Sequence, residues 1–260
     1  MAATKEALRP EREDSPLSVA NSSSTNEDST LDSDTDSECE PKTFTASDIV
    51  SVIVGKKRTV FKFHSHILMK KSPFFQKCLT SGMIEQQTNE VVLPEDSSRA
   101  FEIVAAGVYS RGRNTAKAVL SGDDSDVRLV MRAWVLADKY CMPNLQNGLI
   151  DELGSFWKRH YVHPSYLSWV ADHTDDKSPL YRLVMDQMAY ELKNGGDDLG
   201  HCNFEGDLEK VLARPILSTR LLWKSIHAPD DEEAPAESPQ KYHVPTNSQI
   251  GGTTSTNAAK

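Results

Sequence analysis

The stretch DIVSVIVGKKRTVFKFHSHILMKKSPFF, residues 48–75, carries most of the information about the fold. Residues 48–54 form an apolar, β-branched run of strand length, and the glycine and basic residues of 55–59 follow as a turn. Residues 60–63 then alternate as a second strand. Two short strands joined by such a turn predict a β-hairpin at the start of the domain.

The second half of this stretch predicts two helices. Ser65 is placed to cap a short helix, and Ser72 followed by Pro73 pairs a favourable N-cap residue with proline at the first helical position. The helix after Pro73 has an apolar stripe made of Phe74, Phe75, Cys78 and Leu79. This periodicity indicates a helix with one face in the core.

Residues downstream of the opening stretch continue as one strand and then helices. A third short strand is expected at 91–93, followed by a helix capped by Asp96 or Ser97. Residues 110–125 are interpreted as a polar insertion. Further helical patterns occupy 127–140, 143–156, 164–171, 179–193 and 208–226. Pro215 is expected to break or kink the last of these, and the order of elements predicts an α+β fold.

The charge of the chain is concentrated near its ends. The net charge is −9, but residues 1–43 hold eleven acids and four bases, and residues 228–260 hold five acids and two bases. The part between them is therefore nearly neutral, which argues against direct nucleic-acid binding. Both end segments are polar and short of large apolar groups, so they are predicted to be disordered.

Cysteine usage and hydropathy predict an intracellular protein. The four cysteines are widely spaced without a CxxC pair, and the first residues lack the apolar stretch of a secretory signal. No run approaches the 18 or more apolar residues of a membrane span. Nucleus and cytoplasm both stay open, and no membrane partner is expected.

No motif for catalysis or cofactor binding is present. The sequence has no G-x-S-x-G, no phosphate-binding glycine loop and no H-E-x-x-H. His64 and His66 form His-x-His, but two ligands do not complete a zinc site. His64 is expected instead to satisfy backbone groups where a strand turns into a helix. We therefore predict no enzyme, no catalytic or metal-binding residues, no cofactor and no small-molecule substrate.

The ordered set of short motifs resembles the BTB/POZ domain. The opening residues of that resemblance are Asp48–Val54, Phe61–His64, Ile67–Leu68 and Ser72–Phe75. It continues through Met83–Glu85, Val91–Pro94, Ala100–Glu102, Val108–Tyr109, Leu136–Tyr140 and Met142–Leu145. The arrangement is similar to stand-alone BTB proteins of filamentous fungi.

The resemblance implies a small β-sheet flanked by helices and a role in binding other proteins. Together with the composition of the ends and the helical patterns, it predicts four segments: a disordered acidic tail over 1–43, the BTB/POZ domain over 44–155, a helical C-terminal extension over 156–227, and a disordered tail over 228–260. The expected partners are a second copy of the chain, as a homodimer, and a cullin scaffold.

Two positions depart from the patterns of known binding modes. Asp48 and His64 match a charged pocket of dimeric family members, but Ser65 stands where many of them have a basic residue. Cys78-Leu79-Thr80 aligns with a hydrophobic–any–Glu triplet that often precedes the Met83 segment in cullin-binding members, and it lacks the Glu. The resemblance thus makes these residues the candidate partner-binding site: Asp48, His64, Cys78, Leu79, Thr80 and Met83.

Three functions stay open at this point. The first is a non-enzymatic protein–protein interaction module that self-associates or binds a partner. The second is a substrate adaptor of a cullin-RING ubiquitin ligase, and the third is a nuclear transcriptional co-regulator that acts through the acidic tail. That tail also contains four candidate phosphorylation sites, each with an acid three residues later: Ser29, Ser33, Thr35 and Ser37.

Overall fold

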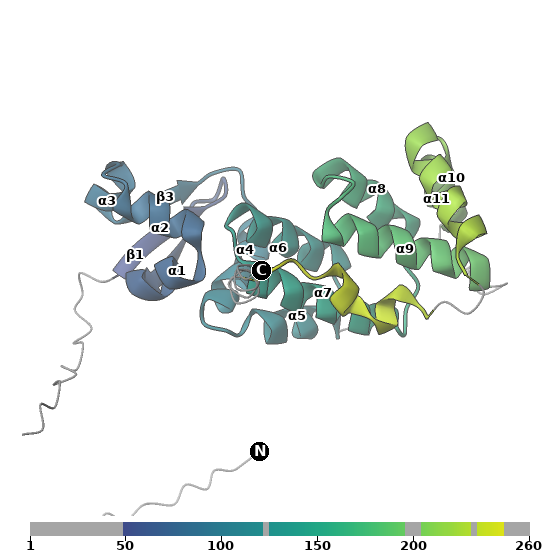
Figure 1. The fold of residues 1–260 in the computed structure, drawn as a ribbon. Helices are drawn as coiled ribbons and strands as arrows, with labels where there is room; N and C mark the ends of the chain where they lie inside the picture. Colours follow the sequence, from purple (N-terminus) through teal and green to yellow (C-terminus); the bar gives the residue numbers. More distant parts are fainter. Residues whose placement is uncertain (1–48, 122–124, 196–203, 230–232, 247–260) are drawn as a thin grey trace, which may run out of the picture. The chain divides into compact units, whose positions relative to one another are not determined.

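A computed structural model describes residues 49–121, 125–195, 204–229 and 233–246 (Figure 1). The first part contains β1 (Ile49–Val54), β2 (Thr59–His64), α1 (Ser65–Lys71), α2 (Pro73–Thr80), α3 (Ile84–Thr88), β3 (Glu90–Leu93), α4 (Ser98–Val108) and α5 (Gly112–Leu120). The second contains α6 (Val127–Lys139), α7 (Pro143–Trp157), α8 (Pro164–His173), α9 (Pro179–Asn194), α10 (Phe204–Leu212) and α11 (Pro215–His227). Two short 3-10 helices follow, η3 (Pro235–Glu237) and η4 (Pro239–Tyr242). The predicted tail over 1–43 lies outside the described residues.

The three strands form one mixed sheet in the order β2-β1-β3, which confirms the α+β prediction. β1 pairs antiparallel with β2 as the predicted hairpin and parallel with β3. Val50, Val52 and Val54 are fully buried and point to one face of the sheet because alternate residues of a strand share a face. This face of the sheet forms one side of the hydrophobic core, and the helices form the opposite side of the core.

The Ser72-Pro73 motif does what the sequence predicts. The Ser72 hydroxyl accepts a hydrogen bond from the Phe75 N–H at 3.3 Å and donates one to the Tyr140 carbonyl at 2.6 Å. Ser72 therefore caps α2 and also fastens it to the end of α6. The predicted cap at Ser65 is wrong: His64 occupies the N-cap position of α1, and no side-chain cap bond is made there.

Aromatic side chains fill the centre of the domain. The Tyr140 ring lies 5.0 Å from Phe75 and 5.9 Å from Phe101 between ring centroids. The Tyr140 hydroxyl donates to Asp96, and burial together with this contact raises the Tyr140 pKa far above its usual value. Asp96 also binds the Lys139 ammonium at 2.8 Å, while Ser97 rather than Asp96 caps α4. These contacts fix α6 against the turn that precedes α4.

The segment interpreted as a polar insertion, residues 110–125, instead contains α5. Its buried positions Gly112, Ala116 and Leu120 are four residues apart and form a narrow stripe against α4 and α7. A Cβ added at Gly112 would lie 2.6 Å from a methyl group of Leu145. The prediction failed because this helix packs through glycine and alanine, which add little to an apolar pattern.

Helices α8 to α11 follow α7, and their buried side chains belong to the same hydrophobic core as those of the sheet. α8 packs against α9 and α10, and α11 packs against α9. Leu180, Leu183 and Val184 of α9 are fully buried. Pro215 does end one helical stretch, because α10 stops at Leu212 and α11 begins at the proline.

The expectation that residues 228–260 are disordered is wrong for residues 233–246. This segment, here named the C-terminal strap, contains η3 and η4 and packs against α7 and α9 (Figure 1). Ala236 is fully buried, and Tyr242 is 5% exposed. Residues 230–232 and 247–260 lie outside the described residues.

Candidate functional site

The outer face of the three-stranded sheet carries an apolar row. Val60, Ile53 and Val92 lie side by side across β2, β1 and β3, because Ile53 is in register with both valines. Val60 is 54% exposed and Val92 47% exposed, whereas Ile53 between them is buried. Apolar side chains that reach across a sheet and stay half exposed form a surface suited to binding another protein.

A second row on the same face carries opposite charges at its two ends. Ser51 is in register with Lys62 on β2 and with Glu90 on β3, and both charged residues are exposed. The outer face therefore presents a positive edge, a negative edge and an apolar row beside them. The strand alternation around Val60 and Val92 is the sequence signal that could have identified this surface.

His64 contacts a tyrosine within the domain. Its Nδ1 lies 3.1 Å from the Tyr109 hydroxyl, and its backbone N–H donates to the same hydroxyl at 3.3 Å. The His66 ring is 6.0 Å from the His64 ring, but within the described ranges no three His, Cys, Asp or Glu side chains come together as a metal site. Asp48, the expected neighbour of His64, lies outside the described residues.

The triplet Cys78-Leu79-Thr80 ends α2, but its side chains differ in accessibility. Leu79 is buried in the core, Cys78 packs partly against it, and the Thr80 hydroxyl donates to the Gln76 carbonyl at 2.7 Å. Burial, followed by the charge of Glu85, raises the pKa of the Cys78 thiol. A raised pKa disfavours the thiolate and so argues against a nucleophilic role.

Met83 and Ile84 form the exposed part of this region. Met83 is 58% exposed and Ile84, the first residue of α3, is 63% exposed. The sequence pointed to Met83 and missed Ile84, which starts a helix of only five residues with no buried position. Of the candidate residues around α2 and α3, Thr80 and Met83 are therefore the ones available to a partner.

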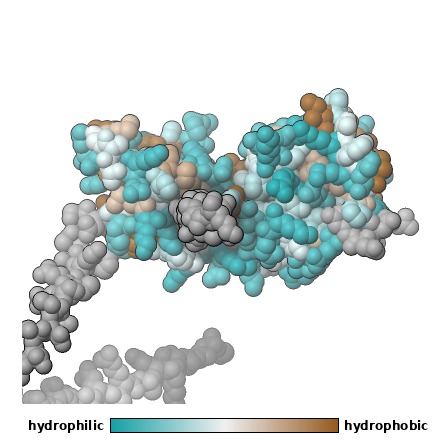
Figure 2. Space-filling view, in the orientation of Figure 1, coloured by the Kyte–Doolittle hydropathy of each residue, from teal (hydrophilic) through white to brown (hydrophobic). Residues whose placement is uncertain are grey.

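A further exposed apolar face lies on α11. Its members are Ile216 at 74%, Leu222 at 49%, Trp223 at 64% and Ile226 at 73% exposed. Hydrophobic atoms are visible over α10 and α11 in the space-filling view (Figure 2). This face is distant in sequence from the sheet surface, which makes it useful as a matched control.

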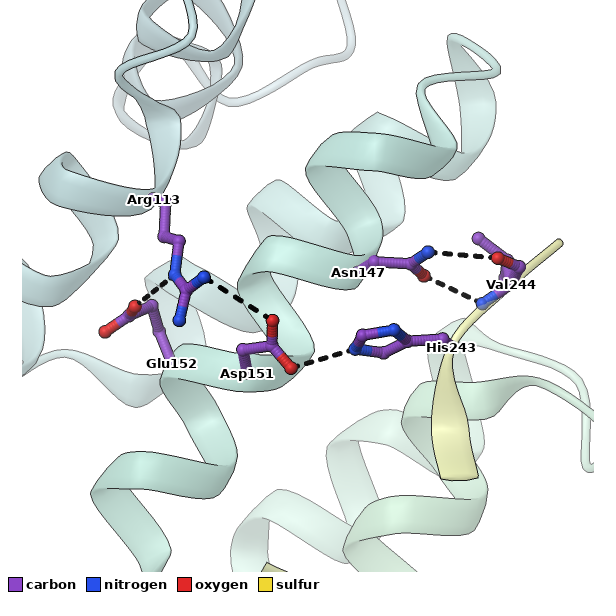
Figure 3. A network of polar contacts seen from close by, with 6 residues as sticks. All are labelled: Arg113, Asn147, Asp151, Glu152, His243 and Val244. Carbon is purple, nitrogen blue, oxygen red and sulfur yellow. Dashed lines mark hydrogen bonds and ion pairs between the residues drawn. The ribbon is translucent and has the colours of Figure 1, made fainter. Parts of the chain in front are cut away.

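A polar network joins α5, α7 and the strap (Figure 3). The Asp151 carboxylate lies 3.6 Å from Arg113 and 2.8 Å from Nε2 of His243. Arg113 also binds Glu152 at 2.6 Å. Each of these groups has a partner within the network, which ties the strap to α7 and α5.

The remaining predicted features fall on other parts of the chain. Ser29, Ser33, Thr35 and Ser37, and with them the acidic tail invoked for a co-regulator, lie outside the described residues. Within the described ranges, no helix is both long and apolar enough to cross a membrane.

The range that contains the sheet surface matches a known protein family. Residues 42–153 match the family model of the BTB/POZ domain. The match begins before β1 and ends within α7, and it contains all the motifs identified in the sequence. No curated protein matches the chain.

Proposed function

The chain contains a BTB/POZ domain, a protein–protein interaction module, and we propose that it self-associates through the outer face of the sheet in this domain. BTB domains are generally not enzymes, and the candidate surfaces described above are apolar and charged contact faces. The proposal concerns which face is used and what it binds. The exposed row of Val60 and Val92 on either side of Ile53 carries it.

The charge pattern of this face suits a second copy of itself. A two-fold axis that runs along β1 between two facing sheets would bring β2 of one protomer over β3 of its partner. Lys62 would then lie opposite Glu90, and Val60 opposite Val92, because each pair shares a row of the sheet. Two-fold interfaces use the same patch on both subunits, so such self-complementarity is the pattern they require.

Sedimentation velocity of the full chain over a range of concentrations tests the proposal. We expect a monomer–dimer equilibrium that Val92→Lys shifts strongly toward monomer, since lysine would bury a charge in the apolar row. Trp223→Lys on α11 is the matched control, because Trp223 is similarly exposed and lies on another surface. A monomer at every concentration, or equal effects of the two variants, would contradict the proposal.

A second candidate function is supported by the exposure of Met83 and Ile84. An adaptor of a cullin-RING ubiquitin ligase needs an accessible contact in this region, and these two side chains supply apolar area beside Thr80. Binding of the full chain to a purified cullin scaffold tests it by calorimetry. Met83→Glu should abolish saturable binding and Val92→Lys should leave it unchanged; a chain that never binds the scaffold is not an adaptor.

A further inference from the structure

The C-terminal strap lies on α7 and α9 in the manner of a bound peptide. Pro235, Ala236, Pro239 and Tyr242 are buried in the contact. The strap has little regular structure of its own, only two short 3-10 helices of three and four residues. Its position is therefore determined by the surface beneath it.

Side-chain amides of the groove bind the strap backbone at both ends. Asn147 of α7 donates to the Val244 carbonyl at 3.0 Å and accepts from the Val244 N–H at 2.8 Å (Figure 3). Gln187 of α9 accepts from the Ala236 N–H at 2.8 Å, and it donates to Glu191 at 2.8 Å. Main-chain hydrogen bonds of this kind give affinity for an extended peptide whatever its side chains.

Three further contacts select side chains of the strap. The Tyr242 hydroxyl donates to Asp186 at 2.9 Å, and His243 lies 2.8 Å from Asp151. At the other end, Glu237 pairs with Lys158, the residue after α7, at 2.6 Å. The groove thus requires an acid near one end of its ligand, and a hydroxyl-bearing aromatic followed by a nitrogen donor near the other.

A glycine on α7 makes the close approach possible. A Cβ added at Gly154 would lie 2.9 Å from Cβ of Pro239 and 3.2 Å from the Ala236 carbonyl oxygen. A larger residue would hold the strap away from the helix. The groove is therefore shaped for a peptide that has proline and small residues at its centre.

We propose that this groove between α7 and α9 is a second protein-docking site, and that the strap is a built-in ligand occupying it. The partner is a linear segment of another protein with the chemistry of the strap: Pro-Ala-Glu, a second proline, and a Tyr-His pair. The partner segment binds when it displaces the strap. This site is separate from the sheet face and does not depend on self-association.

Attachment to the same chain gives the strap an effective concentration on the order of millimolar, so it masks the groove from weak ligands. A strap-weakened full chain with Tyr242→Ala, His243→Ala and Val244→Pro leaves every groove residue intact. Proline at 244 lacks the backbone N–H that donates a hydrogen bond to the Asn147 side chain. This variant uncovers the groove for a direct binding measurement.

Fluorescence anisotropy with a labelled peptide of residues 233–246 tests the proposal. We expect saturable binding to the strap-weakened chain and binding at least about tenfold weaker to the wild-type chain, since the latter holds its own strap. Adding Asn147→Ala and Gly154→Leu to the strap-weakened chain should remove binding, and adding Val92→Lys should not. A folded strap-weakened chain that does not bind, or that binds no better than wild type, overturns the proposal.

Hydrogen exchange of the wild-type chain provides a second test that needs no variant. Amides of the strap should exchange faster than those of α7 and α9, because a displaceable ligand opens without global unfolding. If the strap amides exchanged only as slowly as the amides of α7, the strap would be an integral part of the core, and the proposal would be overturned. A wild-type dimer lost in the strap-weakened chain would place a second copy in the groove, which also overturns it.

Discussion

Glu191 gives the helical extension a pH-dependent stability. Its side chain is buried on α9, where one oxygen accepts from the Val162 N–H at 2.8 Å and the other from Gln187 at 2.8 Å. Burial disfavours the charged carboxylate and raises the pKa of Glu191 to about 7, although both hydrogen bonds act in the opposite direction. Replacing this residue by glutamine removes the titration and keeps the volume.

The size of the effect follows from the difference in pKa between the folded and unfolded chain. Between about pH 4.5 and 7 the folded chain keeps a proton on Glu191 that the unfolded chain releases. The stabilisation from this group is thus fully present below the unfolded pKa and is lost as pH rises through the folded pKa. Evaluating both titrations between about pH 5 and 8 gives a loss of about 2–3 kcal/mol.

Urea denaturation of the wild-type chain and of Glu191→Gln, each at about pH 5 and pH 8, measures this loss. The contributions of all other titrating groups cancel when the pH-dependent change in one protein is subtracted from that in the other. We expect the wild-type chain to lose about 2–3 kcal/mol more than the variant. Equal changes in the two proteins would refute the assignment of a raised pKa to Glu191.

Four substitutions test how the BTB domain is held together, each by urea denaturation. Ser72→Ala should lower the free energy of unfolding by about 2–3 kcal/mol, since it removes a helix cap and leaves the Tyr140 carbonyl without its donor; a loss below about 0.5 kcal/mol would contradict this dual role. Leu79→Ala should lower the free energy of unfolding by about 2–4 kcal/mol, whereas Met83→Ala should change it by less than about 0.5 kcal/mol. A larger loss for Met83→Ala than for Leu79→Ala would show that the wrong side chain is assigned to the core. Gly112→Val should destabilise by about 1–3 kcal/mol through overpacking against α7, and a neutral result would mean that α5 does not pack closely.

The elements that the sequence predicts correctly share one physical feature: large apolar residues at regular spacing or a capping residue at the start of the element. The β-branched run of β1 and the serine and proline that open α2 are examples, since each acts within a few residues of its own position. Ser72 also illustrates the limit. Its cap was predictable, whereas its bond to Tyr140 joins residues distant in the chain and depends on the packed fold.

The features that the sequence does not predict depend on small residues or on tertiary contacts. α5 packs through Gly112 and Ala116, which leave the segment polar in appearance. The strap is polar overall, and its burial depends on Asn147 and Gln187, which only the folded helices bring to it. Among the candidate binding residues, Leu79 and Met83 are both apolar, and only the folded structure separates them, because Leu79 is buried and Met83 is 58% exposed.

A charge exchange across the outer face of the sheet tests the central claim most directly. Lys62→Glu and Glu90→Lys each place like charges opposite one another in the proposed two-fold dimer, and the double variant restores the pairing with the charges reversed. Sedimentation velocity should show weaker dimerisation for each single variant and recovery for the double variant. Additive weakening in the double variant, or no dimer of the wild-type chain, would contradict self-association through this face.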